Sequence, residues 1–249
     1  LRSNGGTDGG IGVKMRALRA LYNDAIRKGT VDEKYYPFKV FKVSKFKSSG
    51  IKKSLTTSEI KKIRGFDERK FPELAESKKL FVFSYFTGGM NFYDIMKLRW
   101  ENIQNERIVY TRSKTKGNFS IEIVEPVKEI LEEYKKVNTA TQYVFPILLK
   151  EGLTPLQIEN RKERKLKKFN KDLKKIAEIL GIESKVSSYV ARHSFATNLK
   201  QIGISTEIIS QSMGHQNVAV TTAYLKDFDN DVIDKSIRRL LEEPKSLYA

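Results

Sequence analysis

The sequence predicts a mainly helical fold with one small antiparallel β-sheet, an α+β arrangement, for this chain of 249 residues. Apolar residues recur at helical spacing in several segments, whereas a single stretch alternates apolar and polar residues around a turn. A basic segment rich in Ser and Gly separates a short N-terminal helical part from the rest. These three observations predict two parts of unequal size, with the sheet in the larger one.

The N-terminal part, residues 1–42, is expected to contain one amphipathic helix. Residues 3–12 are too rich in glycine to be ordered easily and are expected to form a flexible lead. From Val13 onward, apolar residues recur at helical spacing, and Gly29 is placed to end the helix. The basic segment 43–54 is then expected to be a linker, so the second part begins at residue 55.

The second part, residues 55–249, opens with a helix, because Thr56 and Glu59 have the spacing of a capping box. Residues 80–86, LFVFSYF, are apolar all round and predict a buried central helix, although a buried strand has the same pattern. Residues 106–124 alternate around a turn with the sequence Lys-Gly-Asn, which predicts a β-hairpin.

Helical spacing resumes after the hairpin. Two stripes are followed by two short helices, and a further stripe lies near the C-terminus. The segments are 127–134, 166–180, 195–199, 205–213 and 229–243. Gly181 is placed to end the second stripe, and Ser205 is a plausible N-cap.

The charge of the chain indicates its partner. With 47 Lys and Arg against 30 Asp and Glu, the formal net charge is +17. Such an excess favours a polyanionic partner, because each neutralised phosphate releases condensed counterions. Nucleic acid is therefore the first expectation, with a merely well-solvated surface as the alternative.

Cysteine is absent and only two His are present, which excludes a disulfide framework and disfavours a structural zinc site. No apolar run approaches the roughly 18 residues that span a bilayer, and no signal peptide is evident. We expect a cytoplasmic, nucleoid-associated protein without a membrane partner. The chain begins at Leu1 and not Met, as expected of a fragment or a processed chain.

Two motifs near the C-terminus carry the residues of greatest chemical interest. SYVARHSFAT, residues 188–197, contains Arg192, and MGHQNVAVTTAYL, residues 213–225, contains His215 and Tyr224. Taken singly, each residue has an ordinary explanation: a salt-bridge arginine, a histidine at a helix C-terminus and one of 11 tyrosines.

Taken together, these residues resemble the C-terminal signature of the tyrosine recombinase, or phage integrase, family. Tyr224 follows His215 by nine residues, and Arg192 lies in an A-R-H-S-F-A-T segment. Residues 87–100, TGGMNFYDIMKLRW, include a G-M-x-F-x-D segment, which is similar to integrases of conjugative and mobilisable elements. The resemblance extends from Lys53 onward.

The resemblance implies a tyrosine recombinase catalytic domain preceded by the end of a helical, SAM-like core-binding domain. It implies site-specific cleavage and rejoining of double-stranded DNA at attachment sites, for integration or excision of a mobile element. It further implies a homo-tetramer on DNA, accessory DNA-bending proteins as candidate partners, and neither a cofactor nor a metal. A preceding arm-binding domain is also expected.

The chemistry explains why these residue types fit. Cleaving a phosphodiester without a metal requires cationic donors for the phosphate oxygens, a proton for the leaving oxygen and a held nucleophile. Arg192 suits the first role, because its planar fork donates to phosphate in a bidentate manner, and His215 can donate to a second oxygen. The family implies that Lys114, favoured over Lys116 at the hairpin turn, is the general acid, and that Tyr224 forms a 3′-phosphotyrosyl link.

Two positions depart from the family pattern. Asn91 stands where the first catalytic arginine is expected, and loss of such a donor costs roughly 3 kcal/mol or more. We hypothesise that Arg112 compensates, since it lies two residues before Lys114 and projects from the same strand face. The alternative is a solvent-facing Arg112 that pairs with a nearby acid.

The second departure is Tyr189, at the position of the first His in the family's H-x-x-R motif. A phenol with a pKa of about 10 is a poor base, so Tyr189 is expected to orient the phosphate or to pack as ordinary core. Asp94, acidic as in the family, is expected to orient Arg192 or His193.

Three alternatives stay open from the sequence. Asn91 and Tyr189 are compatible with a weak or inactive DNA-binding protein of the same fold, and the tyrosine chemistry is compatible with a type IB topoisomerase-like activity. The apolar stripe of residues 229–243 could pack on its own domain or dock on a neighbouring protomer.

Overall fold

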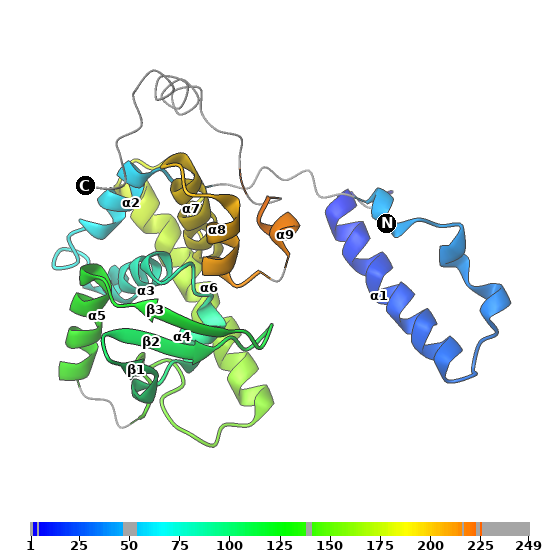
Figure 1. Cartoon of the computed structure of the whole chain (residues 1–249), viewed down its shortest axis with the longest axis horizontal. Helices are drawn as coiled ribbons and strands as arrows, with labels where there is room; N and C mark the ends of the chain where they lie inside the picture. The colour runs from blue at the N-terminus through cyan, green and yellow to red at the C-terminus, as the bar shows by residue number, and fades with distance from the viewer. Residues whose placement is uncertain are drawn as a thin grey trace, which may run out of the picture. The chain divides into compact units, whose positions relative to one another are not determined.

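The structure is a computed structural model that describes residues 2–3, 5–46, 54–137, 141–215, 217–222 and 225. The chain divides into two compact units, Leu1–Ile51 and Lys52–Ala249, and each is described by itself. Figure 1 shows the helices and strands in chain order.

The first unit contains one long helix, α1 (Asp8–Arg27), which begins earlier than the sequence predicts. Thr7 caps the helix, because its hydroxyl accepts a hydrogen bond from the backbone N–H of Gly10 at 3.3 Å. Ile11, in the first turns, is buried. The expectation of a flexible lead over residues 3–12 is therefore wrong for residues 8–12, which are helical.

Three short 3-10 helices, Glu33–Tyr35, Pro37–Lys39 and Val43–Lys45, complete the first unit. Val43 is buried, and a Cβ added at Gly12 of α1 would lie 3.1 Å from the Cβ of Phe46. The start of the expected linker is thus corrected: its first four residues, 43–46, are structured and pack on α1. Residues 47–53 lie outside the described part of the chain.

The second unit is built around a central helix. Helix α2 (Thr57–Arg64) opens it, and the predicted capping box between Thr56 and Glu59 is confirmed. Helix α3 (Ala75–Phe86) follows, and its residues 80–84 are all buried. Residues 80–86 therefore form a buried helix, and the alternative of a buried strand is wrong. The helix is apolar all round because α2 and four later helices, α4, α5, α6 and α7, all contact it.

The sheet consists of β1 (Ile103–Gln104), β2 (Arg107–Thr111) and β3 (Asn118–Glu122), antiparallel in that order. Tyr110 pairs with Phe119 across β2 and β3, and their rings stack at 5.1 Å between centroids. The predicted hairpin is confirmed.

The hairpin turn lies between Arg112 and Gly117. The backbone N–H of Arg112 donates to the Gly117 carbonyl at 2.8 Å, and that of Lys116 donates to the Arg112 carbonyl at 2.9 Å. Lys116 adopts a left-handed conformation with φ of 57°. The turn therefore has a defined backbone that carries Lys114 away from the strands.

Two 3-10 helices, Pro72–Leu74 and Trp100–Asn102, and six further α-helices complete the described part of the second unit. The α-helices are α4 (Phe92–Lys97), α5 (Glu125–Lys136), α6 (Pro155–Ile179), α7 (Ser188–Gln201), α8 (Thr206–Met213) and α9 (Val218–Thr222). Ser205 caps α8 as predicted, and Gly181 follows α6 with a positive φ of 64°. The mainly helical fold with one small antiparallel sheet is confirmed. Residues 229–243 lie outside the described residues.

A small apolar cluster holds α8 on α7. Ala196 of α7 is buried together with Ile209 and Met213 of α8. Full burial of side chains of the size of Ile209 and Met213 contributes about 1.5–3 kcal/mol each. This packing brings the end of α8, and His215 beyond it, next to Arg192 on α7. In Figure 1 the two helices lie side by side next to the sheet.

Candidate active site

Arg192 occupies the centre of the site. Its side chain is buried on α7, with 5% of the residue exposed. Nη1 donates to the carbonyl of Gly89 at 3.0 Å, and Nη2 donates to the carbonyl of Met213 at 2.7 Å. Backbone carbonyls do not cancel the guanidinium charge, so Arg192 keeps the charge that a phosphate would meet.

Gly88 and Gly89 make room for this arginine. Both have positive φ, 71° and 70°, in the turn between α3 and α4. A Cβ at Gly89 would lie only 2.7 Å from the Cα and Cγ of Arg192. Glycine is therefore required at Gly89 for both its conformation and its close approach to α7.

His215 lies beside Arg192, just beyond Gly214, which ends α8 in a left-handed conformation with φ of 63°. Its Nε2 lies 3.0 Å from Nη2 of Arg192, and its Nδ1 lies 2.7 Å from Oγ1 of Thr221. Burial, aided by the positive charges of Arg192 and Arg112, lowers the pKa of His215 to about 4. The imidazole is therefore neutral at pH 7.

Phe119 fixes the turn that carries His215. A Cβ at Gly214 would lie 2.0 Å from Cζ of Phe119 on β3, so only glycine fits there. Because Phe119 also stacks on Tyr110, the β2–β3 hairpin and the His215 turn pack directly on each other. The hairpin that carries Lys114 is thus anchored beside His215.

Arg112 follows β2 and turns into the same site. Its Nη1 donates to the carbonyl of Met213 at 3.3 Å, and its Nε lies 4.0 Å from the carboxylate of Asp94. Only 12% of its side chain is exposed. Arg112 is therefore not a solvent-facing arginine, although it does pair with an acid, as the alternative interpretation expects.

Asp94 joins α4 to the hairpin turn. Its Oδ1 accepts a hydrogen bond from the backbone N–H of Ser113 at 3.0 Å, and its other oxygen lies near Arg112. The sequence instead predicts that Asp94 orients Arg192 or His193. The contacts show a carboxylate that positions the segment from Arg112 to Lys114.

Asn91 has a structural role in α4. Its Oδ1 accepts from the backbone N–H of Asp94 at 3.1 Å, which caps the helix, and its Nδ2 donates to the Asp94 carboxylate. The residue that replaces the family's arginine therefore holds in place the acid that pairs with Arg112.

Tyr189 lies one helical turn before Arg192 on α7 and is 48% exposed. Its ring meets that of His193 edge-on, at 4.7 Å between centroids. The exposed fraction argues against ordinary core packing and leaves the predicted phosphate-orienting role open.

A groove of about 700 Å³ brings most of the predicted residues together. Asn91, Arg112, Lys114, Tyr189 and His215 all line it. Arg192 reaches the groove through its contact with His215. Lys116 is not among the lining residues, which agrees with the preference for Lys114. Tyr224 lies outside the described residues.

The structure brings to the site several residues for which the sequence predicts no role. Thr221, the partner of His215, is fully buried, and Tyr93, Glu159 and Lys162 line the groove. Glu159 and Lys162 form an ion pair on α6, far from the motifs in sequence. The only signal for Thr221 was its place in the segment between His215 and Tyr224.

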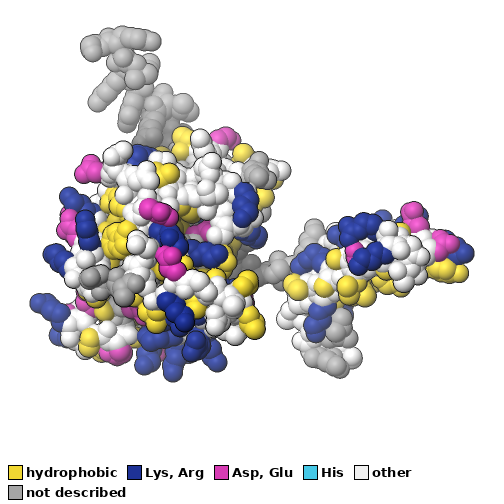
Figure 2. Space-filling view, turned by 90° about the horizontal axis from the view of Figure 1, so that it is seen from below, with side chains coloured by type: hydrophobic (Ala, Val, Ile, Leu, Met, Phe, Trp, Pro, Cys, Tyr) yellow, Lys and Arg dark blue, Asp and Glu magenta, His cyan; other side chains and the backbone are white. Residues whose placement is uncertain are grey.

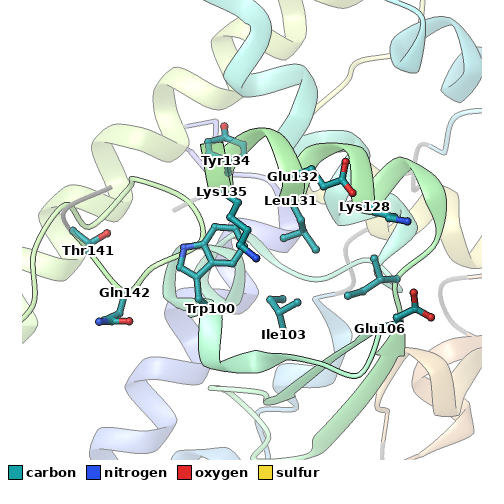
Figure 3. A pocket seen from close by; sticks show the side chains of 11 residues that line it. Trp100, Ile103, Glu106, Lys128, Leu131, Glu132, Tyr134, Lys135, Thr141 and Gln142 are labelled. Atoms are coloured by element: carbon teal, nitrogen blue, oxygen red, sulfur yellow. The ribbon is translucent and has the colours of Figure 1, made fainter. Parts of the chain in front are cut away.

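A second hollow, of about 640 Å³, lies between α5 and the sheet (Figure 3). Trp100, Ile103, Leu131 and Tyr134 form its apolar walls, while the charged side chains of Glu106 and Lys128 stand at its edge. None of the predicted site residues lines this hollow. The groove beside Arg192 is therefore the candidate active site.

Part of the surface of the second unit is strongly basic. Figure 2 shows a dense cluster of Lys and Arg side chains at one edge of the larger unit. Helix α6 exposes basic side chains over several turns, at Arg164, Lys167, Lys171, Lys174 and Lys175. Within the part of the chain that the structure describes, no helix is both long and apolar enough to cross a bilayer.

Known proteins share both sequence and fold with this chain. The XerC tyrosine recombinase of Thermodesulfovibrio yellowstonii is 24% identical over 214 residues, which is 85% of this chain and 69% of that protein. The XerA tyrosine recombinase of Thermococcus onnurineus is 26% identical over 230 residues, or 91% and 73% of the two chains.

Two solved integrases have similar folds. The Tn1549 transposon integrase (residues 82–397), in complex with circular intermediate DNA, aligns with a TM-score of 0.61 and 18% identity, over 95% of this chain and 80% of that one. A lambda integrase dimer bound to a COC′ core site aligns with a TM-score of 0.54 and 16% identity, over 83% and 69%. At these identities the likeness shows the fold.

The family assignment rests on the sequence match. The model of the phage integrase family matches residues 53–231, which is more than half of the chain and contains the entire groove described above. The chain therefore belongs to the phage integrase family and is a tyrosine-type site-specific recombinase.

Proposed function

We propose that this recombinase cleaves and rejoins duplex DNA through a 3′-phosphotyrosyl intermediate formed by Tyr224, in the integration or excision of a mobile element. The observation that carries the proposal is the convergence of two guanidinium groups, those of Arg112 and Arg192, on one carbonyl beside His215. A groove with this charge is suited to a phosphate that becomes more negative as it is attacked.

In the proposed reaction, the Tyr224 hydroxyl oxygen forms a bond to phosphorus while the bond from phosphorus to the 5′ oxygen breaks. Arg192 and Arg112 donate hydrogen bonds to the phosphate oxygens. Lys114, on the hairpin turn that lines the groove, gives its proton to the departing 5′ oxygen. The phosphodiester energy is kept in the tyrosyl link, so that a different 5′ hydroxyl can reverse the step.

Arg112 supplies the guanidinium that is missing at position 91, where the family pattern has an arginine and this chain has Asn91. Its guanidinium is largely buried and lies close to that of Arg192, and Asp94 holds it there while itself tied to the Ser113 backbone. Asp94 lowers the net positive charge of the site, but it fixes the position of the Arg112 guanidinium. Electrostatic stabilisation of a transition state needs donors that are fixed in advance. Tyr189, which also lines the groove, is proposed to orient the phosphate.

The partner in this proposal is double-stranded DNA. The net charge of +17 and the basic face of α6 support it. The fold shared with the Tn1549 transposon integrase supports a role in a mobile element. Assembly as a homo-tetramer is proposed on the same basis, since lambda integrase forms a tetramer bound to a Holliday junction.

A nicked suicide substrate tests the proposal, because loss of a short 5′ fragment traps the covalent intermediate. We expect an adduct that survives SDS in the wild-type protein and is absent in Tyr224→Phe. Binding without an adduct would instead identify a non-catalytic DNA-binding protein. Plasmid relaxation by the monomer without strand exchange would identify a topoisomerase-like activity.

A further inference from the structure

The hydrogen bonds of His215 determine which of its ring nitrogens carries hydrogen. Nε2 lies 3.0 Å from Nη2 of Arg192, and a guanidinium has only donors to offer. Nε2 must therefore accept, since an N–H at this position would point at another N–H. Nδ1 then carries the hydrogen and donates it to Oγ1 of Thr221 at 2.7 Å.

Thr221 is well placed to hold this arrangement. It is fully buried on α9, six residues after His215. Bulk water therefore does not compete with the imidazole for the Thr221 hydroxyl. The neighbouring Thr222 behaves differently: its side chain is exposed, and its hydroxyl donates to the Val218 carbonyl of its own helix at 3.2 Å. Of these two threonines, Thr221 is the one whose hydroxyl contacts the imidazole.

We propose that Thr221 is a positioning residue that, together with the donor-only guanidinium of Arg192, holds His215 in the tautomer with hydrogen on Nδ1, so that the Nε2 lone pair faces Arg192 and His215 acts as a proton acceptor in the reaction. This reverses the role that the sequence suggests, in which His215 donates a hydrogen bond to a phosphate oxygen. The neutral state of the ring, with its pKa lowered to about 4, agrees with an acceptor.

The acceptor role rests on the proposed function and completes its proton transfers. When a phosphate engages the Arg192 guanidinium, the Nε2 lone pair can receive the proton of the attacking Tyr224 hydroxyl, as the bond from oxygen to phosphorus forms. The 5′ oxygen takes its proton from Lys114. His215 thereby supplies the base that the phenol of Tyr189 cannot supply at neutral pH.

The charged groups around the ring favour this neutral form. Arg192 on α7 and Arg112 after β2 both oppose protonation of His215. Lys114 and the carboxylate of Asp94 also line the groove, and that carboxylate pairs with Arg112. The hydroxyl of Thr221 can accept from Nδ1 without adding charge, which suits a neutral imidazole better than a carboxylate would.

The tautomer can be measured directly, because the chain contains only two His. In protein labelled with ¹⁵N-histidine, a multiple-bond ¹H–¹⁵N spectrum distinguishes a nitrogen that carries hydrogen from one that does not, and His193→Gln assigns the signals. We expect hydrogen on Nδ1 of His215 in the wild-type protein and in Thr221→Ser. We expect a mixture of tautomers in Thr221→Val and no change in Thr222→Val.

A wild-type protein with hydrogen on Nε2 would overturn the proposal, and so would a Thr221→Val protein with the wild-type tautomer. The wild-type spectrum decides the question even where Thr221→Val fails to fold. The spectra need no DNA, so they test the tautomer separately from the proposed function, which fails if the wild-type protein forms no covalent adduct.

The rate of adduct formation tests the acceptor role. We expect Thr221→Val to be roughly 10- to 100-fold slower than wild type, by analogy with residues that orient the imidazole ligands of metal sites, while Thr221→Ser and Thr222→Val stay within a few-fold. The wild-type rate should not fall as the pH rises between about 5 and 8, because the neutral ring is the active form. A rate that falls over this range would show that a charged donor is needed, and would overturn the acceptor role.

Discussion

Arg112 and Arg192 donate to the same atom, the carbonyl oxygen of Met213, at 3.3 Å and 2.7 Å. Two cations share one acceptor at the end of α8, although they lie 80 positions apart in sequence. Their mutual repulsion is tolerated because Asp94 lies near Arg112. A bound phosphate would relieve this repulsion, which favours anion binding at this point.

Replacement of Arg112 by Ala should slow cleavage of a suicide substrate by about 100- to 1,000-fold, as expected for loss of one donor to the transition state. Arg112→Lys should be intermediate, because it keeps the charge but loses the planar fork. Arg107→Ala is the matched control, since Arg107 lies on β2, the strand that leads to Arg112, is exposed and contacts Ser120. Single-turnover adduct formation measures all three, and unimpaired cleavage by Arg112→Ala would limit Arg112 to a structural role.

Replacement of Gly89 by Ala should displace Arg192. The added Cβ would lie 2.7 Å from Arg192, and the left-handed conformation costs roughly 1–2 kcal/mol in addition. Gly152→Ala provides the control, because Gly152 has a similar φ of 68° with no heavy atom within 4 Å of an added Cβ.

Both glycine variants should lose stability in urea denaturation, but only Gly89→Ala should also lose cleavage activity at a temperature where it is folded. Equal activity in the two variants would show that the position of Arg192 does not depend on this close approach.

Replacement of Asn91 should change the free energy of unfolding more than it changes the electrostatics of the site. Asn91→Ala removes the cap of α4 and should lower the free energy of unfolding by about 1 kcal/mol, whereas Asn91→Ser keeps a capping oxygen and should be close to wild type. Urea titrations compare the variants. If Asn91→Ser is as stable as the wild type yet fails to cleave, Asn91 contacts the DNA itself.

The basic face of α6 should contribute to DNA affinity. The triple variant Arg164→Gln, Lys167→Gln and Lys171→Gln should reduce the dependence of log K on log salt by about 0.9 for each lost phosphate contact. The control removes the same charge elsewhere, through Lys61→Gln, Lys62→Gln and Lys136→Gln at exposed positions of α2 and α5. Titrations with labelled duplex at several salt concentrations give both slopes, and equal slopes would place the DNA away from α6.

The free energy of unfolding should fall as the pH drops from 6.5 toward about 4, because in this range His215 is protonated in the unfolded chain but not in the folded protein. Its pKa falls from 6.5 to about 4 in the folded protein, so the unfolded chain binds more protons between these values. The stabilisation is complete above pH 6.5 and is lost progressively toward pH 4. His215→Gln should flatten this part of the profile in urea titrations at each pH, and an unchanged slope would contradict the lowered pKa.

The sequence predicts helices and strands correctly where local patterns, such as apolar periodicity and capping residues, determine them. The capping box at Thr56 and Glu59, the hairpin around Lys116 and the buried helix at residues 80–86 all follow from local patterns. The start of α1 does not, because its ordering depends on the cap at Thr7 and on packing against residues 43–46, which the sequence predicts to be linker.

The site is predicted only in part, for a similar reason. Side-chain types and the family pattern single out Arg192 and His215, but the shared acceptor is a backbone atom of Met213, which no side-chain pattern reveals. The partner of His215, Thr221, follows from the tight turn after α8 and the short helix α9. Asn91 is a departure from the family pattern in sequence, yet it is a satisfied helix cap in the structure.

The most direct test of the account identifies the residue that is bonded to DNA. The tryptic peptide from residues 201 to 226 contains a single tyrosine, Tyr224. After digestion of the trapped adduct with nuclease and trypsin, mass spectrometry should find the residual nucleotide on this peptide, attached to Tyr224. A nucleotide on any other peptide, or no covalent link in a protein that binds the substrate, would contradict the proposed chemistry.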